Sequence, residues 1–282
     1  MKDFKEGINE KNDRILLANL EDKMRQADEW YTVTNSSFFD MRERSLAVRQ
    51  CREKCRCGYA FYGGYEDAER KVAVFYPREL IENESEDENA EKIENVRRIE
   101  DYFRDEPESC PLTIIRASLK KGSPQLGHRD YLGSLMGLGI RRDVIGDIIV
   151  HDDGADIVVL KEIADFLVMN YSKAARANLI ISEVPITEIR PSKVQIVQKD
   201  ESVASLRLDA MISAAFRISR GKSAEAIKAG LVYVSDVCEK KTDKIVDLGD
   251  KLVLRGKGKA VVKNIGRTTD KGRTIVTIAR YM

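Results

Sequence analysis

The spacing of hydrophobic residues changes in a regular order between Pro111 and Ile189. Alternating or continuous apolar runs are typical of strands, whereas apolar positions three or four apart are typical of helices. The segment predicts a strand, a helix, two strands, a helix and a strand, over residues 112–119, 128–139, 144–152, 155–163, 166–175 and 179–189. Residues 152–154 (Asp-Asp-Gly) supply a hairpin turn between the two central strands. This βαββαβ order predicts a ferredoxin-like (RRM-like) domain over residues 109–190.

The first 108 residues predict a small α/β domain. Helices are expected over residues 13–30 and 36–55, and a β-rich run over 71–77 stops at its final residue, Pro77. Residues 82–108 contain twelve acidic and four basic residues, which is typical of a solvated helix or linker. We therefore expect an N-terminal α/β domain that ends in an acidic helical linker.

Residues 191–282 predict a third unit, in which two short helices precede a set of strands. Ser205 is the expected N-cap of the first helix, and Gly230 is the expected left-handed terminator of the second. Strands are expected over 231–237, 250–262 and 273–281. The chain is accordingly predicted to be an α+β protein of three small domains, the last built from two helices and a β-hairpin.

The net charge of +1 hides a strong asymmetry along the chain. Residues 190–282 hold 20 Lys and Arg against 10 Asp and Glu, a net charge of +10, whereas residues 1–189 hold 28 against 37, a net charge of −9. A basic module joined to a body without that bias favours a polyanionic ligand. We expect this ligand to be RNA and not DNA.

The C-terminal unit concentrates its basic residues on the two helices and on the segment Arg255–Lys259. Few aromatic residues lie among them, so we expect contacts with the RNA backbone and shape instead of stacking on single bases. In the segment RGKGK, alternate cations are predicted to project from one side of a strand. The candidate RNA-binding residues are Arg207, Arg217, Arg220, Lys222, Lys228, Arg255, Lys257 and Lys259.

Three segments resemble known families. SLRLDAMISAAFRISRGKSAEAIKAGLVYV followed by DLGDKLVLRGKGK resembles the RNA-binding domain named after protein four of the small ribosomal subunit. YGGYEDAERKVAVFYP (62–77) and LGHRDYLGSLMGLGIRRDVIGDI (126–148) are similar to signature segments of the bacterial YlmH family, whose members carry that RNA-binding domain at the C-terminus. This resemblance covers nearly the whole chain.

The resemblance implies a non-enzymatic protein that binds structured rRNA and tRNA on the large ribosomal subunit. It also implies a role in ribosome-associated quality control of stalled translation. We expect a cytoplasmic monomer without a cofactor or metal, because no apolar run approaches the roughly 18 residues that a membrane helix needs and the five cysteines are sparse.

Other interpretations remain open at this point. Arg207-Leu208-Asp209 is similar to the catalytic segment of pseudouridine synthases, which would make the chain an RNA-modifying enzyme; the alternative role of Asp209 is to pair with a local Arg or to cap a helix. The acidic body could instead serve as a protein-binding adaptor. The central strands of the middle domain lack an aromatic pair for base stacking, which favours a scaffold or protein-contact role there. Additional RNA contacts are assigned to Arg129, Arg141 and Arg142.

Overall fold

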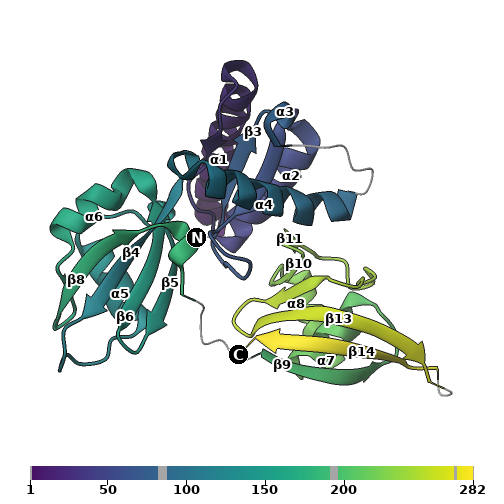
Figure 1. Cartoon of the computed structure of the whole chain (residues 1–282). Helices are drawn as coiled ribbons and strands as arrows, with labels where there is room; N and C mark the ends of the chain where they lie inside the picture. Colours follow the sequence, from purple (N-terminus) through teal and green to yellow (C-terminus); the bar gives the residue numbers. More distant parts are fainter. Residues whose placement is uncertain (1, 82–87, 191–195, 270–271, 282) are drawn as a thin grey trace. The chain divides into compact units, whose positions relative to one another are not determined.

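The computed structural model describes the backbone of residues 2–81, 88–190, 196–269 and 272–281. Its contacts divide the chain into two compact units, residues 1–192 and residues 193–282 (Figure 1). Helices and mostly antiparallel strands are mixed in both units, which confirms the predicted α+β class. The boundary predicted at residue 108 falls inside the first unit.

The first unit begins with a three-stranded sheet between helices. Strand β3 lies in its centre, in the order β1-β3-β2. Every residue of β3 is buried, because Ala73 and Phe75 pack in a core with α1 and α2 while Val72, Val74 and Tyr76 join a second core on the other face. The elements are α1 (Lys2–Trp30), β1 (Thr34–Asn35), α2 (Met41–Lys54), β2 (Gly58–Tyr62), β3 (Val72–Tyr76), α3 (Arg78–Ile81) and α4 (Glu88–Asp105).

The acidic segment is a packed helix over much of its length. Residues 82–87 lie outside the described part of the chain, and α4 follows them. Ile99 and Phe103 on α4 are buried in the second core, next to Tyr62. The charged residues of this helix therefore accompany an apolar stripe that anchors it.

The rest of the first unit is a five-stranded sheet with two helices. The order of elements is strand, helix, strand, strand, helix, strand, as the hydrophobic pattern predicts, with the short β7 added before β8. The antiparallel sheet has the order β5-β6-β4-β8-β7, so β6 and β4 are the inner strands of the βαββαβ set. These elements are β4 (Leu112–Leu119), α5 (His128–Gly137), β5 (Ile145–His151), β6 (Gly154–Leu160), α6 (Ala164–Asn170), β7 (Lys173–Ala174) and β8 (Ala177–Val184).

The two sheets of the first unit share one core. Phe38, Tyr62 and Val74 from the first sheet region belong to the same buried cluster as Ile114 and Val158 from the second. The ring of Phe38 lies against Gly146 and Val158, where a Cβ on Gly146 would come within 2.8 Å of it. One face of the five-stranded sheet is thus partly covered by the N-terminal part of the chain.

The segments 62–77 and 126–148, which carry the sequence resemblance, meet at this junction. Asp147 accepts hydrogen bonds from the Tyr65 hydroxyl at 2.7 Å and from the backbone N–H groups of Glu69 and Arg70 at 2.7 and 3.0 Å. Arg70 Nε in turn donates to the carbonyl of Ile145 at 2.9 Å. These residues therefore hold the two parts of the first unit together.

The second unit is a six-stranded antiparallel sheet with two helices on one face. Its strand order is β11-β10-β12-β13-β14-β9, and Met211, Ile212 and Ile227 from the helices pack on Leu252 and Val262 of the sheet. The elements are β9 (Ile196–Val203), α7 (Leu208–Phe216), α8 (Arg220–Lys228), β10 (Val232–Val234), β11 (Val237–Cys238), β12 (Lys251–Leu254), β13 (Gly258–Thr268) and β14 (Thr274–Tyr281).

The helix ends of the second unit differ in how well local sequence predicts them. Gly230 follows α8 with φ +71°, which confirms the predicted left-handed terminator. The prediction that Ser205 caps α7 is wrong, because α7 starts at Leu208 and Arg207 occupies the N-cap position. The carbonyls of Lys244 and Thr242 instead accept hydrogen bonds from the first N–H groups, those of Leu208 and Asp209.

Candidate RNA interface

A short turn, residues 217–219, joins α7 to α8 and leads into the N-terminus of α8. Arg217 ends α7 in the left-handed conformation, at φ 51° and ψ 49°. Ser219 then caps α8, because its hydroxyl accepts a hydrogen bond from the N–H of Lys222 at 3.2 Å. The buried Ile227 anchors α8 to the sheet, so its remaining faces stay available to solvent.

Asp209 organises the start of both helices. Its carboxylate is 7% exposed and pairs with Arg220 Nε at 2.9 Å and with Arg207 Nε at 3.4 Å. Burial alone would raise the pKa of Asp209, but its hydrogen bonds and ion pairs with Arg220 and Arg207 outweigh burial and lower it. The prediction that Asp209 pairs with a local Arg is confirmed. Two of the candidate RNA-binding residues therefore share one internal carboxylate, although Arg207 and Arg220 remain 41% and 53% exposed.

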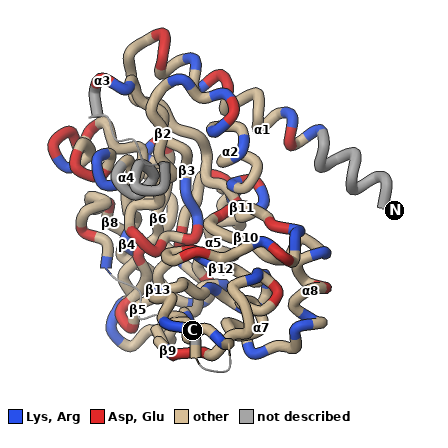
Figure 2. The backbone as a smooth tube through the Cα atoms, turned by 90° about the vertical axis from the view of Figure 1, so that its right-hand side faces the viewer, with Lys and Arg blue, Asp and Glu red and all other residues tan. Residues whose placement is uncertain are grey.

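Five other candidate residues are exposed and form no ion pair within the described part of the chain. They lie at both ends of α8 and in the neighbouring hairpin, where Figure 2 marks basic positions in blue. Their charges are therefore available to an external anion. The residues are Arg217, Lys222, Lys228, Arg255 and Lys257.

The basic hairpin between β12 and β13 contacts the C-terminal end of α8. The N–H of Arg255 donates to the carbonyl of Leu231 at 2.9 Å, and Leu231 comes directly after Gly230. Residues 255–257 form the turn, closed by a hydrogen bond from Lys257 N–H to the Leu254 carbonyl at 2.8 Å. The structure therefore brings Arg255 close to Lys228, at the opposite end of α8 from Lys222.

The alternation predicted for residues 255–259 differs from the observed geometry. The turn interrupts the strand, so the three cations do not follow one strand face. Lys259 pairs with Val253 of β12, and the core-facing positions of β13 are Ala260 and Val262. Lys259 therefore lies on the sheet face opposite the helices, with its Nζ 4.0 Å from the centre of the Tyr281 ring.

The loop after β11 adds two lysines that the sequence analysis missed. Lys240 and Lys241 are exposed, and both of their backbone N–H groups donate to Glu239 Oε1 at 2.8 Å. The Lys240 Cε atom lies 3.5 Å from the position of a Cβ on Gly230, which places this side chain at the C-terminal end of α8. The adjacent pair of lysines was the available sequence signal, but its distance from α8 depends on the tertiary fold.

The three additional candidates in the first unit have different environments. Arg129 is exposed and has no ion pair among the described residues, whereas Arg141 pairs with Asp143 at 3.1 Å. Arg142 turns inward, where its NH1 group donates to the carbonyls of Ile145 and Gly146 at 2.7 and 3.1 Å. Burial, together with the nearby charge of Arg70, lowers the pKa of Arg142 to about 10. Arg142 thus serves the junction of the first unit.

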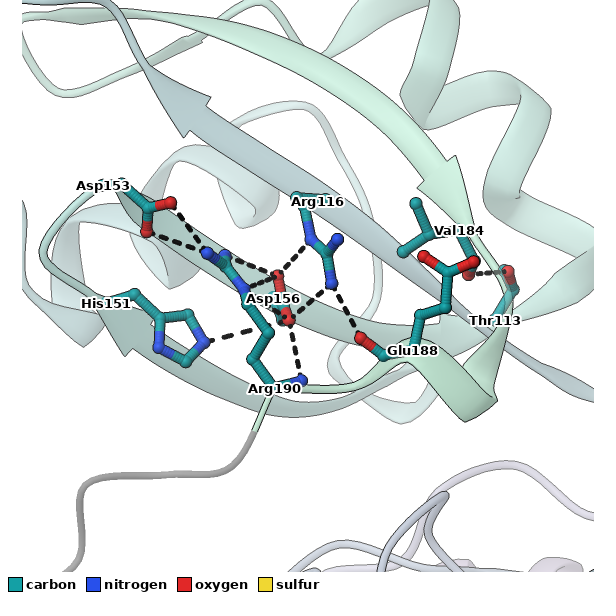
Figure 3. A network of polar contacts seen from close by, with 8 residues as sticks. All are labelled: Thr113, Arg116, His151, Asp153, Asp156, Val184, Glu188 and Arg190. Atoms are coloured by element: carbon teal, nitrogen blue, oxygen red, sulfur yellow. Dashed lines mark hydrogen bonds and ion pairs between the residues drawn. The ribbon is translucent and has the colours of Figure 1, made fainter.

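The inner strands of the five-stranded sheet carry an ion network where base-stacking aromatics would lie in an RNA-recognition sheet (Figure 3). Asp156 on β6 is fully buried and accepts from Arg116 Nε at 2.9 Å and Arg190 NH2 at 2.8 Å. Arg190 also pairs with Asp153 at 2.8 Å. The two guanidinium groups of this network are therefore neutralised by its two carboxylates.

The described part of the chain contains neither a metal-binding cluster nor a membrane-spanning helix. Its residues include no group of three or more His, Cys, Asp or Glu side chains arranged to hold a metal ion. None of its helices combines the length and the apolar character that crossing a membrane requires.

Comparisons with known proteins give matches to a family model, a curated relative and a solved structure. Residues 111–188 match the family model described as "Putative RNA-binding domain in YlmH". The chain is 29% identical over 270 residues to the "Ribosome-associated protein quality control protein P2" of Bacillus subtilis (strain 168), covering 96% of each chain. A solved structure, "Cell division protein ylmH from Streptococcus pneumoniae", is similar at 16% identity with a TM-score of 0.45, over 63% of this chain and 93% of that one.

The family description differs from the sequence interpretation in one respect. The model that residues 111–188 match is described as a putative RNA-binding domain, whereas the missing aromatic pair in these residues favoured a scaffold or protein-contact role. The matched interval contains β4 to β8 with both of their helices. Together with the B. subtilis match along nearly the whole chain, this model confirms the resemblance to the YlmH family that the sequence motifs predict.

Proposed function

We propose that this protein is a non-enzymatic RNA-binding factor that docks on structured rRNA and tRNA of the large ribosomal subunit. The observation that carries the proposal is a set of exposed cations around α8 that form no ion pair with any described residue, namely Arg217, Lys222, Lys228, Arg255 and Lys257. The printed name of the B. subtilis relative, a ribosome-associated quality control protein, supports a role in handling stalled translation.

The cation set favours recognition of phosphates held in a fixed arrangement. Lys222 and Lys228 lie six positions apart on α8, a separation of about 9 Å along a helix axis. The partly exposed guanidinium groups of Arg220 and Arg207 add positive charge to this surface, and their ion pairs with Asp209 fix their orientation. Lys240 extends the surface at the C-terminal end of α8, where it lies near Gly230. The residues assigned to this surface are cations and include no aromatic side chain for base stacking. Such a surface suits the phosphates of a folded RNA backbone.

We expect binding of the full chain to purified large-subunit rRNA or tRNA to depend steeply on salt. If about five phosphates are neutralised, the logarithm of the association constant should fall against the logarithm of salt concentration with a slope of magnitude about 3.5 to 4.5. Replacing Lys222, Lys228 and Arg255 together by Ala should reduce that magnitude by about 2 to 3. Filter binding or fluorescence anisotropy over a salt series measures both.

The matched control removes the same charges elsewhere on the same unit. Lys199, Lys263 and Arg267 are exposed on β9 and β13, away from the hairpin turn that contacts α8. Their combined replacement by Ala should leave the salt slope close to that of the natural chain. Equal slopes for the two triple variants would contradict the proposed interface.

The RNA-modifying alternative makes a separate prediction at Asp209. Because Asp209 serves here to orient Arg207 and Arg220, Asp209→Asn should lower the free energy of unfolding by about 1.5–3 kcal/mol, the value of a charge-assisted hydrogen bond. The nucleoside composition of cellular rRNA and tRNA should not change. Mass analysis of those nucleosides tests this: a modification lost in cells without the protein, restored by the natural chain and not by a folded Asp209→Asn variant, would replace our proposal with the enzymatic one.

The middle segment gives a second, weaker contact in this proposal. Arg129 is the additional candidate whose charge is both exposed and unpaired, whereas Arg141 and Arg142 have internal partners. We therefore assign Arg129 to the RNA surface of the matched family domain, and Arg142 to the stability of the first unit.

A further inference from the structure

Three cysteines of the first unit gather where α2 ends and β2 begins. Cys51 lies on α2 and is 1% exposed, and Cys57 directly precedes β2 and is 3% exposed. Cys55 lies between them and is partly exposed. The neighbours of the cluster are apolar, with Met24 and Phe75 in the same core. The RNA-binding proposal gives these thiols no task.

Cys55 and Cys57 are in direct contact. Their sulfur atoms lie 3.4 Å apart, and Cys55 Sγ also donates to the carbonyl of Cys57 at 3.3 Å. Cys55 has extended backbone angles, φ −72° and ψ 125°. A disulfide requires two side chains that face each other, and the short contact between the two Sγ atoms meets that requirement.

The contact between the two sulfur atoms also shifts the pKa values of the two thiols in opposite directions. The hydrogen bond from Cys55 lowers the pKa of Cys57, and the same bond raises the pKa of Cys55. A thiolate is the reactive form of cysteine towards peroxides and disulfides. Cys55 opens the pair to solvent, whereas Cys51 has a pKa raised by burial to about 12. The described residues contain no metal-binding arrangement, so the geometry favours oxidation over metal binding.

We propose that Cys55 and Cys57 form an oxidisable pair that peroxides convert into a reversible disulfide. One sulfur takes an oxygen atom from hydrogen peroxide, giving a sulfenic acid and water; the other sulfur displaces that oxygen as a second water, and the S–S bond forms. In total, two thiols and one peroxide give one disulfide and two waters. The small ring between neighbouring positions strains the bond, so glutathione should reduce it readily.

Trypsin mapping of the full chain tests the proposal directly, because Arg52 and Arg56 separate the three cysteines. After brief hydrogen peroxide treatment and alkylation, we expect the dipeptide 55–56 joined through a disulfide to peptide 57–70, or the uncut peptide 55–70 lighter by two hydrogens. Cys51, Cys110 and Cys238 should remain alkylated. Full alkylation of all five cysteines, a link to Cys51, or conversion to sulfinic acid would overturn the assignment.

Variants provide the second measurement. Cys55→Ser and Cys57→Ser should each abolish the linked product and leave a sulfenic acid that dimedone traps on the remaining cysteine. Cys238→Ser is the matched control, because Cys238 is also partly exposed but lies in the other unit, with its sulfur against the Gly230 carbonyl. The control should form the product as fast as the natural chain. Glutathione should restore both thiols, and a product that resists it would contradict a strained bond.

Discussion

Asp156→Asn is expected to lower the free energy of unfolding of the first unit by about 3–5 kcal/mol, the cost of removing one partner from a buried ion pair. The natural carboxylate has no exposed surface and takes up the charges of Arg116 and Arg190. An Asn at this position keeps the shape but removes the counter-ion of Arg116, and it leaves Arg190 to pair with Asp153 alone among the described residues. Urea unfolding followed by circular dichroism measures the loss.

Glu183→Gln is the matched control for this variant. Glu183 lies on β8, which pairs with β4 in the same sheet; it is exposed and undergoes the same change from carboxylate to amide. Its replacement should change the unfolding free energy by less than about 0.5 kcal/mol. Similar values for the two variants would show that the network in Figure 3 does not stabilise the unit.

The same carboxylate gives a defined dependence on pH. Burial raises the pKa of Asp156, but hydrogen bonds from Arg190 and Arg116 outweigh burial and lower it to about 2. Because this folded-state pKa lies below the unfolded value of about 3.9, the stabilisation is complete above about pH 4 and is lost as the pH falls towards 2. The difference in unfolding free energy between the natural chain and Asp156→Asn should therefore shrink by about 2 kcal/mol over that interval.

Gly154→Ala is expected to destabilise the first unit by about 3 kcal/mol or more, since it combines backbone strain with overpacking. Gly154 starts β6 with φ +148°, a conformation that residues with side chains rarely adopt. A Cβ there would lie 2.1 Å from the carbonyl oxygen of Ala117 on the adjacent strand β4. Gly154 and Ala117 both lie on hydrogen-bonded, paired strands, so neither backbone can move to relieve this contact.

Gly122→Ala separates the two causes of this effect. Gly122 also has a positive φ, +85°, but a Cβ there would meet no atom within 4 Å. Gly122→Ala should therefore lower the free energy of unfolding only by the backbone strain of a positive φ, about 1–2 kcal/mol. Thermal or urea unfolding of both variants compares them, and an equal loss for the two would mean that the contact with Ala117 is relieved elsewhere.

The apolar pattern of the sequence predicts the middle of the chain well because its inner strands are continuous, largely apolar runs: every residue of β6 and the first four residues of β4 are buried. The segment 112–119 is a strand with the predicted bounds, and the turn lies at Asp152 and Asp153. Strand β9 was missed, since it is an edge strand whose side chains are mostly exposed and so lack an apolar period. Its existence depends on pairing with β14, more than 70 residues later.

The charge count predicts a basic surface but not the arrangement of its members. It treats Arg220 and Lys222 alike, yet Arg220 shares a buried carboxylate with Arg207, while Lys222 has no ion-pair partner in the described part of the chain. It also groups Lys259 with Lys257, although strand pairing directs Lys259 to the other face of the sheet. Helix capping fails similarly at Ser205, because backbone carbonyls from residues 242 and 244 supply what a local rule assigns to a side chain.

The contact between Phe38 and Gly146 makes two positions that are distant in the sequence depend on each other sterically. The 38th residue lies outside the interval that matches the family model, while the 146th lies inside it. Any larger residue at 146 would collide with the aromatic ring and with Val158. The side chains that fit at positions 38 and 146 therefore depend on each other, and a larger residue at 146 is expected to require a smaller one at 38.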